Sequence, residues 1–165
     1  MKRRTLLGAL ALAAGAGQAQ ARPALELGQT VPGPDMELLG GGRFGTAQAD
    51  GNAVVVVFWT TTCPFCRRHN KHVEKLHRAA MATPGTRLRV LGVARETDAD
   101  AVARYARAQG YTFPITMNQP GLAELLAPRR MVPMTVTVDR QGRLKQALPG
   151  EMFEEDVLEL LALAG

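Results

Sequence analysis

The chain's only two cysteines, Cys63 and Cys66, are separated by a proline and a phenylalanine, Pro64 and Phe65. Thiols at this spacing can form a disulfide with each other, because one helical turn brings such positions together. The loop that this disulfide closes is very short, so the bond constrains the unfolded chain little and its value lies in reactivity. The pair therefore predicts thiol-disulfide redox chemistry. A zinc site or a structural pair is the alternative, although no second ligand pair with zinc-finger spacing is present.

A buried strand and a helix are expected to position the two thiols. Residues 54–58 form an apolar run without alternation, which is typical of a strand covered on both faces. A helix is predicted over residues 66–81, so Cys63 lies at its N-terminus, where free backbone N–H groups favour thiolate. Pro64 suits the first helical turn because it has no N–H. We therefore expect Cys63 to be the attacking nucleophile and Cys66, on the buried helical stripe, to be the resolving thiol.

The rest of the chain alternates strands and helices. The expected elements are a hairpin over 36–44, a strand over 88–94, a helix over about 98–109, an extended piece over 113–117, a short helix over 122–126, a strand over 135–138, a hairpin turn over 139–142 into 143–147, and a terminal helix over 154–163. This order predicts an α/β fold with a mixed central sheet flanked by helices, parallel crossovers first and an antiparallel hairpin last.

Residues 1–21 have the features of a secretory signal peptide. A basic start at Lys2, Arg3 and Arg4 precedes a short apolar stretch, and small residues follow, so we expect cleavage after Ala21. The paired arginines are one feature of twin-arginine export signals. We therefore expect a periplasmic protein without a membrane span in its mature form; an uncleaved anchor is the alternative.

The remaining residues divide into a lead-in over 22–30, expected to be flexible, and one domain over 31–165. Of the 165 residues, 46% are hydrophobic and 21% are charged, as in ordinary globular proteins. The basic start of the signal carries three of the five net positive charges. No basic stripe with interleaved aromatic residues is present, so the sequence argues against a nucleic-acid partner.

Several motifs together resemble a known family. A strand ending in Phe58-Trp59, the Cys-x-x-Cys pair and a distant x-Pro before a strand resemble the thioredoxin fold. The N-terminal hairpin, Phe113-Pro114 and the segment 132–143 are similar to the periplasmic TlpA/ResA-type thiol-disulfide oxidoreductases, from about residue 28 to residue 164. The resemblance implies a thioredoxin-like fold with an added N-terminal β-hairpin.

The resemblance also implies the activity and the partners. The expected function is reduction of protein disulfides through a mixed disulfide, without a cofactor or a metal. The expected partners are disulfide- or thiol-bearing periplasmic proteins, with an upstream membrane electron donor, and the expected state is a monomer. Cytochrome c maturation, copper-site reduction and general disulfide repair all fit such a reductase.

By the same resemblance, Pro133 is expected to be a cis-proline that faces the cysteines. The backbone of Val132 would then turn outward and pair with a bound peptide as an added strand. An ordinary trans proline in a turn is the alternative. Trp59 is expected to shield the disulfide from one side, with Pro64 and Phe65 packing around it; as a simple core aromatic, Trp59 would look the same in sequence.

Two positions depart from the family's pattern. Val57 stands where thioredoxin has a buried acid, so proton transfer to the resolving cysteine needs another group. His69 stands where TlpA/ResA-type proteins often have a glutamate, on the same helical face as Cys66. Because histidine titrates near neutral pH, His69 is a possible proton acceptor for the Cys66 thiol. A hydrogen-bonded core histidine without a kinetic role is the alternative.

Two other functions use the same cysteines. With His69, His72 and nearby methionines, the thiols could form a copper(I)-binding chaperone-type module, since soft sulfur and imidazole ligands suit that ion. One helix cannot easily turn all four side chains toward one ion. A peroxiredoxin-like peroxidase is suggested by Thr60-x-x-Cys63, but Val56 occupies the position of that family's proline.

Overall fold

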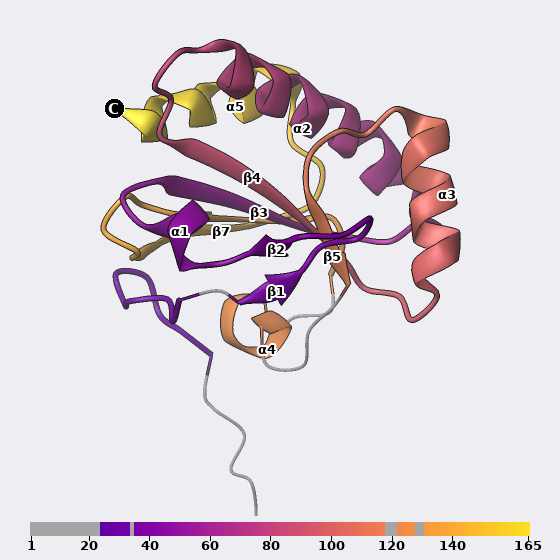
Figure 1. Cartoon of the computed structure of the whole chain (residues 1–165), viewed down its shortest axis with the longest axis horizontal. Coiled ribbons are helices and arrows are strands. Elements are labelled where there is room, and N and C mark those ends of the chain that lie inside the picture. The colour runs from indigo at the N-terminus through magenta and orange to yellow at the C-terminus, as the bar shows by residue number, and fades with distance from the viewer. Residues whose placement is uncertain (1–23, 34, 118–121, 128–130) are drawn as a thin grey trace, which may run out of the picture.

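A computed structural model describes residues 24–33, 35–117, 122–127 and 131–165, so the expected signal peptide lies outside the described residues. The centre is a five-stranded sheet in the order β5-β4-β3-β6-β7 (Figure 1). Its strands are β3 (Ala53–Trp59), β4 (Leu88–Ala94), β5 (Ile115–Met117), β6 (Met134–Val138) and β7 (Leu144–Pro149). β3, β4 and β5 run parallel, whereas β6 and β7 are antiparallel to their neighbours. The predicted mixed sheet is confirmed.

Helices cover one face of this sheet, and a hairpin with a short helix covers the other (Figure 1). The first face carries α2 (Pro64–Ala82), α3 (Ala99–Gln109) and α5 (Glu154–Glu159), which continues as a 3-10 turn over Leu160–Ala164. The second face carries the antiparallel β1 (Met36–Glu37) and β2 (Arg43–Phe44) with α4 (Leu122–Leu126). A four-residue helix, α1 (Thr46–Ala49), was not predicted from the sequence.

All seven residues of β3 are buried, and they alternate between two apolar cores. Val55, Val57 and Trp59 face the helical layer with α2, whereas Val56 and Phe58 face the hairpin layer. A strand with apolar cover on both faces gives the run of valines without alternation that the sequence shows. An apolar cavity of about 310 Å³ lies in the hairpin layer.

The N-terminal segments are tied to the sheet by backbone hydrogen bonds. Leu39 N–H donates to Ile115 O at 2.6 Å, which joins the hairpin to β5. The described part of the lead-in is also held: Gly28 N–H donates to Leu144 O at 2.7 Å, and Leu144 N–H donates to Gln29 O at 2.9 Å. The lead-in expected to be flexible therefore pairs with the start of β7 over these residues. In the part of the chain that the structure describes, no helix is long and apolar enough to span a membrane.

Glu74 on α2 fastens the helix to the segment before β5, although it is an acid in a buried position with only 8% exposure. Its carboxylate accepts the N–H of Thr112 at 2.7 Å, the hydroxyl of Thr112 at 2.6 Å and the N–H of Phe113 at 3.3 Å. Arg78, one turn later, also donates to it. Burial alone raises the pKa of Glu74, but these hydrogen bonds outweigh it and lower the pKa below its ordinary value.

Replacing Glu74 with glutamine is expected to destabilise the fold by about 1–3 kcal/mol at pH 7, because charge-assisted hydrogen bonds to buried N–H groups are lost. Urea unfolding measures this difference. Glu155→Gln, which changes an exposed carboxylate near the C-terminus, is the matched control and is expected to stay within about 0.5 kcal/mol of wild type.

The same variant has a definite pH dependence. Since the folded pKa of Glu74 is lowered, its stabilisation is present above the ordinary value of 4.5 and is lost as pH falls through the folded pKa. The gap in unfolding free energy between wild type and Glu74→Gln should therefore shrink below about pH 4.5. A gap that stays constant down to pH 2 would show that the carboxylate charge is not the stabilising element.

Candidate active site

Cys63 caps the N-terminus of α2, as the sequence predicted. Its backbone is extended, and its Sγ accepts the backbone N–H of Cys66 at 3.2 Å. Pro64 occupies the first helical turn, where no N–H is needed. Cys63 is half-buried rather than sealed in the core, and the end of the helix stabilises negative charge on its Sγ.

Cys66 lies one turn further and is fully buried, with 0% exposure. Burial, followed by a hydrogen bond with Cys63, raises the pKa of the Cys66 thiol to about 12. Both cysteines are free, so the structure shows the reduced dithiol. The two thiols are chemically unequal: Cys66 keeps its proton at neutral pH and the accessible Cys63 is the group that can attack.

The segment Val132–Pro133 is distant in sequence from the cysteines and lies against Cys63. Its peptide bond is cis, and the thiol of Cys63 lies 3.8 Å from the carbonyl oxygen of Val132. Behind it, the N–H of Gly150 donates to the carbonyl oxygen of Pro133 at 2.8 Å. The structure thus brings together the loop and the two cysteines that the sequence assigned to one site.

Trp59 is fully buried and packs in the same core as Cys66, on the side of α3. Its ring lies 6.0 Å from Tyr105 and 5.9 Å, edge to face, from Tyr111. Gly92 on β4 makes room for this aromatic wall, because an added Cβ would lie 2.7 Å from the ring of Phe113. Trp59 is therefore part of the aromatic packing in the core that contains Cys66. This position agrees with both expectations, a shield for the disulfide and a simple core aromatic.

Phe65, in contrast to the buried Trp59, lies at the surface and is 55% exposed. The guanidinium of Arg68 lies 4.9 Å from the centre of its ring, and Arg68 also pairs with Glu151 at 2.6 Å. Phe65 thus forms an exposed apolar edge beside Cys63 that is held in place by a stacked arginine.

His69 is fully buried on α2, three residues after Cys66 and on the same face of the helix. Its Nε2 lies 2.9 Å from the hydroxyl oxygen of Thr135, and its Nδ1 accepts the N–H of Met152 at 3.3 Å. The role of His69 as proton acceptor for Cys66 stays a prediction, and both ring nitrogens already have other partners.

Two further polar groups near the site were not identified from the sequence. Glu96, just after β4, accepts both the N–H and the hydroxyl of Thr61, which fastens the loop before Cys63. Asn70 is fully buried beside Tyr111, and neither atom of its amide forms a hydrogen bond of ordinary geometry. Nothing in the sequence near Glu96 or Asn70 indicates these contacts, because each partner comes from an element far away in the chain.

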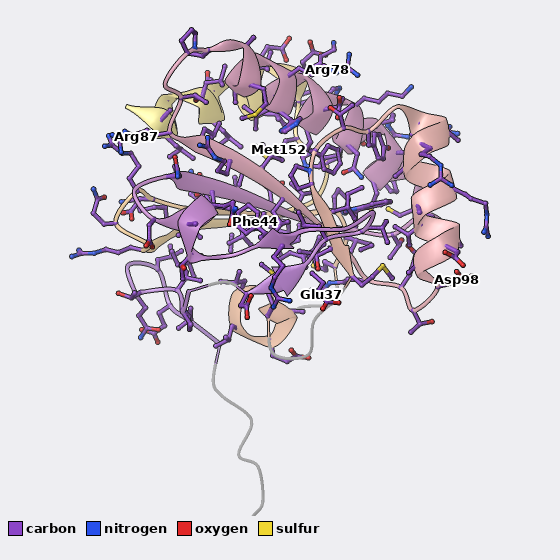
Figure 2. All side chains as sticks on the ribbon, viewed as in Figure 1. Glu37, Phe44, Arg78, Arg87, Asp98 and Met152 are labelled. Atoms are coloured by element: carbon purple, nitrogen blue, oxygen red, sulfur yellow. The ribbon has the colours of Figure 1, made fainter. Side chains whose placement is uncertain are left out.

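The copper(I) alternative requires several ligands to converge. Among the described residues, no group of three or more histidines, cysteines, aspartates or glutamates is placed to hold a metal ion. His69 and His72 both direct a ring nitrogen to the backbone of Met152. Figure 2 shows Met152 beneath α2, on the side of the sheet. Both histidines of this ligand set therefore have a backbone partner in the described structure.

The inequality of the thiols can be measured by alkylation with iodoacetamide. In the folded protein at pH 7, the thiol left in Cys63→Ser should react at least about tenfold more slowly than the thiol left in Cys66→Ser. Burial and the raised pKa of Cys66 are the causes, so its rate should keep rising as pH approaches 12. In 8 M urea the two variants should react alike. Equal rates in the folded state would contradict the assignment.

Known proteins share this architecture and this chemistry. A family profile described as Thioredoxin-like domain matches residues 43–165. The thiol-disulfide oxidoreductase ResA of Halalkalibacterium halodurans is 29% identical over 129 residues, which cover 78% of this chain and 71% of that protein. The sporulation thiol-disulfide oxidoreductase A of Bacillus subtilis is 25% identical, over 93% of this chain and 90% of that protein.

The fold has a solved counterpart in the crystal structure of a thioredoxin-family thiol:disulfide interchange protein from Chlorobium tepidum. The TM-score is 0.72 at 23% identity, and the match covers 88% of this chain and 99% of that one. The expected thioredoxin-like fold is confirmed. With its sequence, its sheet order and its paired thiols in agreement, the chain belongs to the thioredoxin-like family and is a thiol-disulfide oxidoreductase related to the ResA proteins.

Proposed function

We propose that this protein is a periplasmic reductase of protein disulfides, with Cys63 as nucleophile and Cys66 as resolving thiol. The observation that carries the proposal is the position of Cys63: its half-buried Sγ caps α2 and faces the carbonyl of Val132, while Cys66 lies buried behind it. A partner's disulfide can reach one thiol and not the other, as a two-step exchange requires.

The reaction follows from this arrangement. The thiolate of Cys63 attacks one sulfur of the partner's disulfide, and the other sulfur leaves as a thiolate that takes up a proton. The thiol of Cys66 then loses its proton and attacks the sulfur of Cys63, which releases the partner's second sulfur as a thiol. Overall, the partner gains two electrons and two protons, and the protein is left with a Cys63–Cys66 disulfide.

Docking of the partner is assigned to the loop at Val132 and Pro133. The outward carbonyl of Val132 beside Cys63 supports pairing with an extended segment on either side of the partner's cysteine. Phe65 adds an exposed apolar contact at the same edge. We assign the protein to disulfide-bearing or thiol-bearing periplasmic partners, acting as a monomer.

The cell must return electrons to the oxidised form. In a compartment where disulfides persist, a membrane-bound donor is required to reduce Cys63–Cys66 after each turnover. The basic and apolar start of the sequence supports export to that compartment, by the general secretory or the twin-arginine route.

The proposal is tested by trapping. In Cys66→Ser, the mixed disulfide at Cys63 cannot be resolved, so the exported variant should accumulate partners that are released by dithiothreitol and identified by mass spectrometry. Wild type should hold about tenfold less, because Cys66 resolves the intermediate.

The double variant Cys63→Ser/Cys66→Ser is the control and should capture nothing. Failure of Cys66→Ser to capture any thiol partner, together with stoichiometric copper(I) on wild type that is lost in Cys63→Ser, would replace the reductase with the metal-binding module.

A further inference from the structure

The ring of His69 connects the helix that carries both cysteines to the two segments that hold Pro133. Thr135, whose hydroxyl oxygen lies 2.9 Å from Nε2, is in β6 two residues after Pro133. Met152, whose N–H lies 3.3 Å from Nδ1, is in the loop between β7 and α5. The ring has 0% exposure, so both bonds are shielded from water.

The protonation of the ring follows from these partners. A backbone N–H can only donate, so Nδ1 must present its lone pair to Met152, and the proton of the neutral ring is on Nε2. Nε2–H then donates to the oxygen of Thr135. Burial first and the neighbouring His72 second lower the pKa of His69 to about 4, although Glu151 opposes them, so the ring is neutral at pH 7. No lone pair remains for a proton from Cys66.

The loop that His69 holds is also the support of Pro133. Gly150 at its start donates its N–H to the carbonyl oxygen of Pro133 at 2.8 Å. On the other side of Met152, Nδ1 of His72 lies 3.2 Å from the carbonyl oxygen of that residue. Two histidines about one helical turn apart therefore hold the backbone of Met152 on both sides, two residues after the glycine that bonds to Pro133.

We propose that His69 is a positioning residue that fixes the Val132–Pro133 loop relative to Cys63 for capture of the partner. The inference rests on the proposed function and assigns His69 to docking rather than to resolution by Cys66. Val132 presents its carbonyl 3.8 Å from the Sγ of Cys63, and a partner strand needs both groups in register. Without the His69 bonds, β6 and the loop after β7 lose the α2 side chain that bonds to both, while the loop keeps the contacts of His72 with Met152 and of Arg68 with Glu151.

The test separates docking from chemistry with two disulfide substrates. His69→Gln and Thr135→Val each remove part of the connection, the second with little change of side-chain shape, and urea unfolding checks that each variant is folded. With insulin as protein disulfide, we expect KM to rise by about tenfold and kcat to change less than about twofold. With 5,5′-dithiobis(2-nitrobenzoate), which needs no strand pairing, the rate should equal that of wild type.

Lys75→Gln is the matched control. Lys75 also joins α2 to α5, through Glu154 at 2.6 Å, but this exposed pair does not reach the loop that holds Pro133. The control should therefore have the KM of wild type for insulin. A loss of kcat at unchanged KM in His69→Gln, with loss of a limb in the pH profile, would make His69 the proton acceptor and overturn the proposal.

Nuclear magnetic resonance of ¹⁵N-labelled histidine gives a readout that does not depend on activity. We expect a protonated Nε2 and an unprotonated Nδ1 for His69 between pH 6 and 8, and loss of the Nε2–H···O signature in Thr135→Val. A proton on Nδ1 would overturn the proposal even in an active enzyme. Wild type that reduces neither substrate would instead refute the proposed function, and the ring's protonation would still be decided.

Discussion

The site depends on one constraint: the start of α2 must leave Cys63 accessible to solvent and bury Cys66 completely. Cys63 can cap the helix only if the chain leaves β3 at Trp59 and enters α2 within a few residues. Cys66 is sealed only if that first turn lies directly on the sheet. Thiol-disulfide exchange by two cysteines needs this inequality, because two equally exposed thiols would compete for the same partner.

The packing beneath α2 maintains the inequality. Glu74 fastens the middle of the helix to the segment before β5, and His69 fastens its first half to β6 and the loop after β7. Gly92 lets the aromatic wall approach the sheet closely enough to cover the back of the dithiol. Polar contacts in a buried layer are directional, so they specify where the helix lies more sharply than apolar packing alone.

The sequence predicted most elements and the placement of the cysteine pair at the start of α2, because those signals are local. The buried stripe from Cys66 through Val73 to Ala80 follows from helical periodicity, and each of these residues is buried. The burial of Glu74 and Asn70 could not be predicted this way, since their surroundings come from the segment around Thr112 and Tyr111. The partners of His69 are likewise far away in sequence, and no local pattern encodes them. The backbone pairing of the lead-in with the start of β7 could not be predicted for the same reason, because the two segments are far apart in the sequence.

Because β3 alternates between two cores, the molecule has two layers. One contains the cysteines and the helices α2, α3 and α5; the other is the hairpin layer with α4. The cavity of about 310 Å³ lies in the second layer, on the far side of the sheet from the dithiol. The residues that line it come from neither α2, α3 nor α5, so substitutions there alter that layer without a direct contact with the helices over the cysteines.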